Sequence, residues 1–261
     1  MNLSKKIKEA YKESDKKVFA VYILLRIAVI ICMILQIIQG NFSNVFYCVL
    51  TLILFVLPLF VEKKFKIDIP DILEIIVLIF IFSAEILGEV NEFYLKVPHF
   101  DTIMHTLNGF VCCGIGFGLV ELLNKNVKNF HLSPFYVTLV AFCFSMTIGV
   151  MWEFYEYGSD KFFKTDMQKD VIIKDISSVK LNLEEINVPI LIEDIKKTTI
   201  EYEGTIYVLE NGYLDIGIND TMKDLLVNFI GAIIFCIFGY IHLKHNDKYK
   251  FTEKLYLKKQ N

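Results

Sequence analysis

The sequence predicts an all-α polytopic membrane protein with six transmembrane helices and a small extracytoplasmic β-rich insertion between helices 5 and 6. Three observations predict this class. The chain of 261 residues is 54% hydrophobic and has a mean hydropathy of +0.48, which is more apolar than a soluble domain of this length. Six apolar runs each approach the ~20 residues that cross a bilayer. Lysines gather in alternate connections between these runs, which is typical of cytoplasmic loops.

The apolar runs predict transmembrane helices at residues 18–39, 43–61, 70–90, 102–123, 134–157 and 221–243. We expect a cytoplasmic N-terminal arm at 1–17, helices 1 to 5 at 18–157, the insertion at 158–219, helix 6 at 220–243 and a cytoplasmic tail at 244–261. The first run is of full spanning length and no Ala-x-Ala-like cleavage site follows it. We therefore interpret it as a transmembrane helix rather than a removed signal.

The distribution of lysines predicts that both chain ends are cytoplasmic. The N-terminal arm, the loops 62–69 and 124–133 and the C-terminal tail are basic, whereas the short connections 40–42 and 91–100 hold only Lys96. Basic loops stay on the cytoplasmic side, and an even number of spans returns the chain to the side on which it began. The long connection between helices 5 and 6 is then external.

This long connection has the composition of β structure. Its segments 171–173, 188–192, 198–202 and 205–209 are rich in β-branched and aromatic residues. Turn signals stand at Glu203-Gly204 and Asn211-Gly212. These features favour a small β subdomain, with a disordered loop as the alternative.

Charge and cysteine usage narrow the function classes. The net charge is −3 and the basic residues are spread over loops and tails, which disfavours a nucleic-acid partner. All six cysteines lie in apolar runs without a Cys-x-x-Cys pair, so we interpret them as packed thiols. Glycines in helices 4 and 6 are expected to permit close helix packing: Gly109, Gly114, Gly116, Gly118 and Gly231.

Ionisable side chains gather where four predicted helices meet the outer face. Helix 4 begins there with Asp101 and His105, which are one turn apart, and Asn108 continues the same stripe. Helices 3, 5 and 6 add further groups at the same level: Glu85 and Glu89; Glu153, Glu156 and Asp160; and Asp220, Asp224 and Asn228. Each helix is assigned independently from hydropathy and lysine bias, so their convergence predicts a site.

Some of these residues have a simpler structural interpretation. Asp101 and Asp220 stand where helix N-caps are expected, and a negative charge is favourable at a helix N-terminus. His105 can be an ordinary packed histidine. Other members lie a turn or more inside apolar sequence, where ionisable groups are costly and usually paired or functional: Glu153, Glu156 and Asp224.

Three pieces of sequence carry a resemblance to a known family. They are Phe100-Asp101-Thr-Ile-Met-His105 with Gly109, Gly149-Val-Met-Trp152-Glu153-Phe-Tyr-Glu156 with Asp160, and Asp220-Thr-Met-Lys-Asp224-Leu-Leu-Val-Asn228-Phe-Ile-Gly231. In these pieces the chain resembles the uncharacterised bacterial YjdF-like or "membrane-spanning protein" group. The Asp101-x-x-x-His105 and Asp224-x-x-x-Asn228-x-x-Gly231 patterns are also similar, more distantly, to VanZ-like proteins, which are associated with glycopeptide-antibiotic resistance. The resemblance implies a multi-pass protein of the bacterial cytoplasmic membrane and supplies no reaction.

Three functions fit the predicted cluster. The first is an enzyme acting on a lipid or envelope precursor at the outer leaflet, with or without a divalent metal ion. Its site would use His105 and Glu153 as the central pair and Asn228 as a hydrogen-bond partner, and the metal-ligand candidates are Asp101, His105, Glu153, Glu156 and Asp224. Expected partners are membrane lipids and a lipid-linked or cell-envelope substrate.

The other two functions need no chemistry at the cluster. In a non-catalytic scaffold or resistance factor, the same residues form a structural network of hydrogen bonds and ion pairs. In an ion-coupled transporter, the carboxylates and His105 titrate or bind a cation. The polar groups are confined to one leaflet and the chain has no evident inverted repeat, and both features count against a complete transport pathway.

Overall fold

The structure is a computed structural model that describes residues 16–65, 67–126, 132–184, 186–244 and 258–259. Most of the predicted arm and tail, and part of the predicted loop 124–133, lie outside the described residues. The described chain is mostly helical, with a β-rich region before the last long helix. It divides into two compact units, Met1–Gly149 with Val227–Asn261, and Val150–Leu226.

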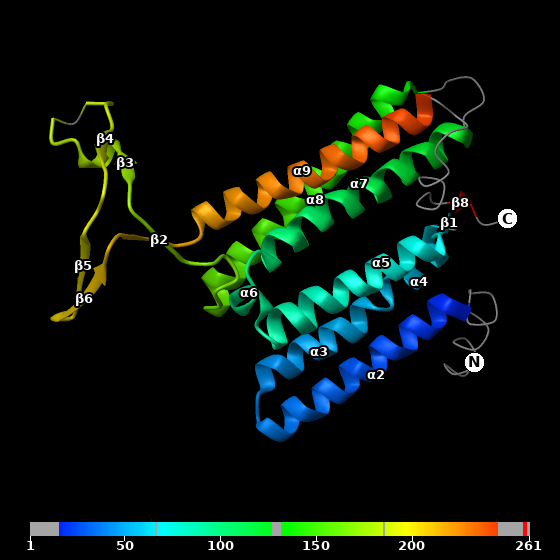
Figure 1. The fold of residues 1–261 in the computed structure, drawn as a ribbon, viewed down its shortest axis with the longest axis horizontal. Helices are drawn as coiled ribbons and strands as arrows, with labels where there is room; N and C mark the ends of the chain where they lie inside the picture. Colours follow the sequence, from blue (N-terminus) through cyan, green and yellow to red (C-terminus); the bar gives the residue numbers. More distant parts are fainter. Residues whose placement is uncertain (1–15, 66, 127–131, 185, 245–257, 260–261) are drawn as a thin grey trace. The chain divides into compact units, whose positions relative to one another are not determined.

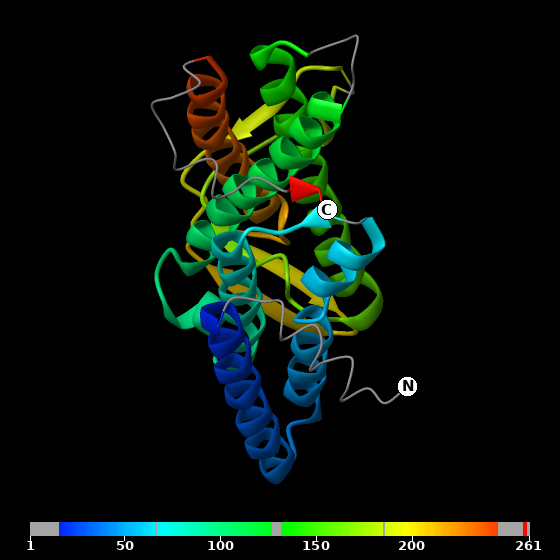
Figure 2. The ribbon, with the colours of Figure 1, turned by 90° about the vertical axis from the view of Figure 1, so that its right-hand side faces the viewer.

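The first unit begins with a helical hairpin. A turn at Gly40, with a φ of 75°, joins α2 (Lys16–Gln39) to α3 (Phe42–Leu54), and glycine adopts this left-handed conformation without strain. Asn41 caps α3, because its side-chain oxygen accepts a hydrogen bond from the Asn44 N–H at 3.4 Å. The two helices lie side by side in both views (Figures 1 and 2), and α4 (Leu57–Phe65) follows α3.

The third predicted span, residues 70–90, is helical but is not one regular helix. α5 (Asp71–Phe82) passes directly into η1, a π-helix (Ser83–Val90), and the short α6 (Phe93–Lys96) follows. Strand β1 (Ile67–Asp68) precedes α5 and pairs with β8 (Lys258–Lys259).

Five helices of the described chain are long and apolar enough to cross a membrane. They are Lys16–Gln39, Phe42–Lys64, Phe100–Asn124, Pro134–Phe163 and Ile218–Lys244, of which the second takes α3 and α4 together. The 70–90 stretch, in which α5 passes into the π-helix η1, is not among them. A sixth span therefore stays a prediction.

Three long helices complete the helical part: α7 (Phe100–Asn126), α8 (Pro134–Phe163) and α9 (Ile218–Lys244). Both α8 and α9 are continuous helices that contribute residues to each unit. In the first unit, Phe117 of α7 and Phe235 of α9 pack edge to face with ring centroids 5.8 Å apart. They belong to a buried apolar core that also contains Val111, Cys113 and Ala232.

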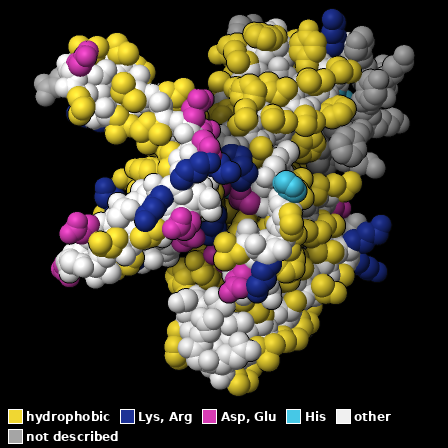
Figure 3. Space-filling model, turned by 60° about the vertical axis from the view of Figure 1, so that its left-hand side comes forward, with side chains coloured by type: hydrophobic (Ala, Val, Ile, Leu, Met, Phe, Trp, Pro, Cys, Tyr) yellow, Lys and Arg dark blue, Asp and Glu magenta, His cyan; other side chains and the backbone are white. Residues whose placement is uncertain are grey.

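The outer surface of the helices is apolar. Leu24 and Ile38 of α2 are 66% and 76% exposed, and Figure 3 shows apolar side chains over much of the helical surface. Water would not favour this amount of exposed aliphatic surface, whereas lipid tails solvate it. These exposed apolar side chains therefore support the prediction of a membrane protein in contact with lipids.

The second unit contains the β-rich region as three antiparallel strand pairs. They are β2 (Val171–Ile173) with β7 (Tyr213–Asp215), β3 (Ile176–Ser178) with β4 (Ile190–Ile192), and β5 (Lys197–Tyr202) with β6 (Thr205–Glu210); the 3₁₀ turn η2 (Val179–Leu181) follows β3. The β5–β6 hairpin turns at Glu203 and Gly204, both with positive φ, as the Glu-Gly signal predicts.

The predicted β structure is confirmed in this region, in place of the alternative of a disordered loop. The helices reach further into it than the predicted boundaries of 158–219. α8 continues to Phe163 and α9 begins at Ile218, because the polar residues at both edges are compatible with a helix that extends beyond an apolar run.

Candidate metal centre

The first turns of α7 hold Asp101 and His105. They are four residues apart, so their side chains lie on one helical face. The His105 Nε2 atom lies 3.4 Å from an Asp101 carboxylate oxygen, and the two side chains are only 10% and 19% exposed. Asp101 is in the first turn of α7, where the helix dipole favours a carboxylate.

Two glycines fix the register between α7 and α9. A Cβ atom on Gly109 would lie 2.0 Å from the Asn228 carbonyl oxygen, and one on Gly231 would lie 2.0 Å from the Thr106 carbonyl oxygen. Only glycine allows the backbones to approach so closely. The Asn108 side-chain amide donates to the Asn228 side-chain oxygen at 3.0 Å. Further along, Gly114 meets Phe235 and Phe117 meets Gly239. The contact positions thus rise together along both helices, which therefore run parallel with their N-termini at the same end.

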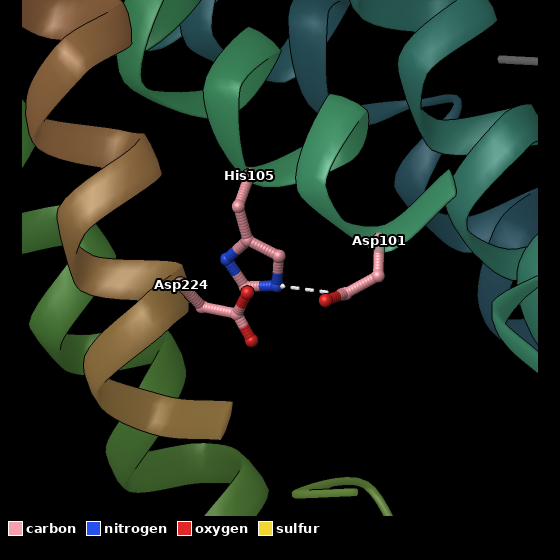
Figure 4. A group of neighbouring side chains, drawn as sticks. All are labelled: Asp101, His105 and Asp224. Atoms are coloured by element: carbon pink, nitrogen blue, oxygen red, sulfur yellow. Dashed lines mark ion pairs between the residues drawn. The ribbon is translucent and has the colours of Figure 1, made fainter. Parts of the chain in front are cut away.

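Asp224 precedes Asn228 by one turn of the same continuous helix, just as Asp101 and His105 precede Asn108 on α7. Asp101, His105 and Asp224 each offer a ligand atom, and these atoms lie within 4.8 Å of one another. Figure 4 shows the three side chains pointing toward one another. His105 and Asp224 are buried, and Asp101 is half-buried.

One imidazole and two carboxylates form a donor set that suits a divalent cation such as Zn²⁺, Mn²⁺ or Fe²⁺. Three protein ligands leave coordination positions open for water or substrate, which distinguishes a catalytic arrangement from a closed structural one. The Asp101–His105 ion pair is also the contact that a purely structural network would use.

Two other predicted site residues, Glu153 and Glu156, are buried on α8. The Trp152 indole N–H donates to the Glu156 carboxylate at 2.7 Å, so this carboxylate has a hydrogen-bond partner on its own helix. Among the described residues, Glu153 and Glu156 do not belong to the ligand group of Asp101, His105 and Asp224. Their proposed roles at the site therefore stay predictions.

Asp160 and Asp220 hold the backbone that follows α8. Asp160 accepts hydrogen bonds from the N–H groups of Met167 and Gln168, at 2.7 and 2.8 Å. Asp220 lies in the first turn of α9, and it accepts from the Lys169 N–H at 2.8 Å. Both carboxylates thus connect a helix to the segment after α8.

The sequence prediction missed Lys223. Its ammonium lies 3.3 Å from an Asp220 oxygen and 3.5 Å from an Asp224 oxygen. The spacing Asp-x-x-Lys-Asp was a usable signal, because residues three apart on a helix are neighbours.

Comparisons with known proteins agree with a membrane protein. An uncharacterised protein of Thermotoga maritima is 29% identical over 104 residues, which cover 40% of this chain and 52% of that protein. The chain thus spans about half the length of the curated relative it matches. No solved structure matches. A family model described as "Predicted membrane protein (DUF2238)" matches residues 20–245, and the chain belongs to this family.

Proposed function

We propose that this protein is a divalent-metal-dependent membrane enzyme that acts on a lipid or cell-envelope precursor. One observation carries the proposal: Asp101, His105 and Asp224 bring an imidazole and two carboxylates together in a largely buried position. Ionisable groups inside apolar helices are costly, and they usually mark functional positions.

The residues have distinct roles in this proposal. Asp101, His105 and Asp224 would hold the ion, which would polarise a substrate oxygen or activate a water molecule. Asn228 is a positioning residue, because its hydrogen bond with Asn108 keeps α7 and α9 in register. Glu153 and Glu156 are proposed as further ligands or as groups that move a proton, as their burial on α8 suggests.

The part of the α7–α9 contact that lies beyond the polar residues favours an enzyme over an ion-coupled transporter. Val111, Cys113 and Phe117 of α7 meet Ala232 and Phe235 of α9 in one buried cluster. A water-filled route along this contact would require these apolar side chains to separate. The cluster of polar side chains therefore fits a site that is open to one side of the membrane better than part of a transport pathway across it.

The location of the site forms part of the proposal. We place it in the outer leaflet of a bacterial cytoplasmic membrane, in a six-span protein with both termini cytoplasmic, from the lysine distribution. The resemblance to YjdF-like and VanZ-like membrane proteins supports the same location. Access from the outer leaflet suits a lipid-linked substrate.

Metal binding by the purified full-length protein tests the proposal. We expect about one equivalent of Mn²⁺ or Zn²⁺ per wild-type chain, and a loss of affinity of at least tenfold in His105→Gln and in Asp224→Asn, since even indirect partners of a metal contribute about 10- to 100-fold. His99→Gln is the matched control, because His99 is an exposed histidine six residues before His105.

Three results would count against this proposal. A wild-type protein that folds but binds no divalent metal contradicts a metal centre. Unchanged metal affinity in His105→Gln would place the ion elsewhere. If both variants melt at lower temperature and metal has no effect on any of the proteins, a structural scaffold is the better interpretation.

A further inference from the structure

We infer that Lys223 and the metal centre together bind a phosphate group, so that the substrate is a phosphate-bearing molecule. The inference rests on the proposed metal-dependent function and adds a substrate class to it. Its basis is the position of the Lys223 ammonium beside Asp224, one of the three ligand residues.

The ammonium of Lys223 lies close to two buried carboxylates. It lies 3.3 Å from Asp220 and 3.5 Å from Asp224, whose side chains are 8% and 1% exposed. The lysine side chain itself is 45% exposed. One end of the lysine thus reaches a metal-ligand residue while much of its side chain remains accessible to a ligand.

A cation bound at Asp224 would change the surroundings of this ammonium. The positive charge of the ion would repel Lys223 and reduce its attraction to the Asp224 carboxylate. Asp220 would still attract the ammonium. The result is two positive charges next to each other, and an anion with several oxygens can bridge them.

The helix termini favour the same kind of ligand. Lys223 is in the second turn of α9, and α7 starts at the same end as α9 because the two helices are parallel. Helix N-termini carry partial positive charge and bind phosphate. Proteins commonly bind a phosphate group by placing a metal ion and a lysine ammonium against its oxygens.

The test measures Mn²⁺ binding and phosphate binding on the same full-length protein in detergent. Electron paramagnetic resonance gives the Mn²⁺ affinity. Relaxation of the phosphorus nucleus of inorganic phosphate by bound Mn²⁺ reports phosphate near the metal. Nanodiscs that contain phosphatidate or only phosphatidylcholine then distinguish a lipid headgroup from free phosphate as the source of the group.

Lys223→Gln is expected to bind Mn²⁺ roughly two- to fivefold more tightly, because a half-exposed ion pair no longer competes with the metal. It should bind phosphate at least about tenfold more weakly, because a charged hydrogen-bond donor is lost. Lys161→Gln is the matched control, since Lys161 is exposed and donates to the Tyr157 hydroxyl, and it should match wild type in both measurements.

Lys223→Arg keeps the charge and should retain phosphate binding within a few fold of wild type, including where the glutamine variant fails to fold. Phosphate binding that is equal in wild type and Lys223→Gln overturns the inference, as does an arginine variant that folds and binds no phosphate. A wild-type protein that binds neither Mn²⁺ nor Zn²⁺ instead overturns the proposed function itself.

Discussion

Asn228 is enclosed almost completely, with 1% of its surface exposed. Its side-chain oxygen accepts from Asn108, and its amide nitrogen lies 3.6 Å from the Met146 sulfur. Three helices thus meet at one amide. An amide in an apolar interior costs free energy unless it is hydrogen-bonded, so these contacts keep the helices in one register.

We expect Asn228→Ala to lower the free energy of unfolding by roughly 1–3 kcal/mol, because it leaves the half-buried Asn108 amide without this partner. The double variant Asn108→Ala/Asn228→Ala removes both groups and should recover part of the loss. Denaturant titration in detergent measures both. If the two single losses simply add in the double variant, the hydrogen bond does not couple the helices.

At the scale of elements, the parallel pair α7 and α9 positions the candidate site. Gly109 lets the α7 backbone touch α9 at Asn228, and Gly231 lets the α9 backbone touch α7 at Thr106. The small residues predicted to permit close packing do so at these two positions. Because the helices are rigid over a few turns, this contact also determines where Asp224 lies relative to Asp101 and His105.

Gly231→Ala is therefore expected to destabilise the protein by roughly 1–3 kcal/mol, since its Cβ would lie 2.0 Å from the Thr106 carbonyl oxygen. It should also weaken metal binding by separating the helices. Gly158→Ala on α8 is the control, because a Cβ there meets nothing within 4 Å and alanine stabilises a helix by up to about 1 kcal/mol. Thermal melting in detergent compares them, and equal melting temperatures would show that the close contact is not required.

For the whole molecule, the number of membrane crossings depends on the stretch that contains α5 and η1. Its twenty consecutive helical residues, Asp71 to Val90, would extend about 30 Å at the α-helical rise, which is close to the thickness of the hydrocarbon core. From Ser83 onward its hydrogen bonds are π-helical, so the stretch consists of an α-helical part followed by a π-helical part. Length alone therefore permits a sixth crossing.

Accessibility of single cysteines decides between five and six crossings. In a variant whose six native cysteines are replaced, Lys63→Cys and Glu92→Cys flank this stretch on exposed positions. Six spans predict that a membrane-impermeant thiol reagent labels Glu92→Cys from outside in intact cells and Lys63→Cys only after the cells are opened. Labelling of both from one side would show that α5 and η1 do not cross.

The sequence by itself determined the membrane class, five of the long apolar helices and the β-rich composition of the connection. These properties follow from local hydropathy, and lipid imposes a length on each span. Local spacing also placed Asp101 and His105 on one face of α7, because residues four apart are neighbours on any helix.

Only the tertiary structure decided which helices bring their polar residues together. Asp224 joins Asp101 and His105, whereas hydropathy treated Glu153 and Glu156 as equal candidates. The rotation and axial offset of a helix depend on packing against its neighbours, here on Gly109 and Gly231, and the pattern of one helix does not contain that information. The π-helical end of the third stretch and the position of Lys223 beside Asp224 were decided in the same way.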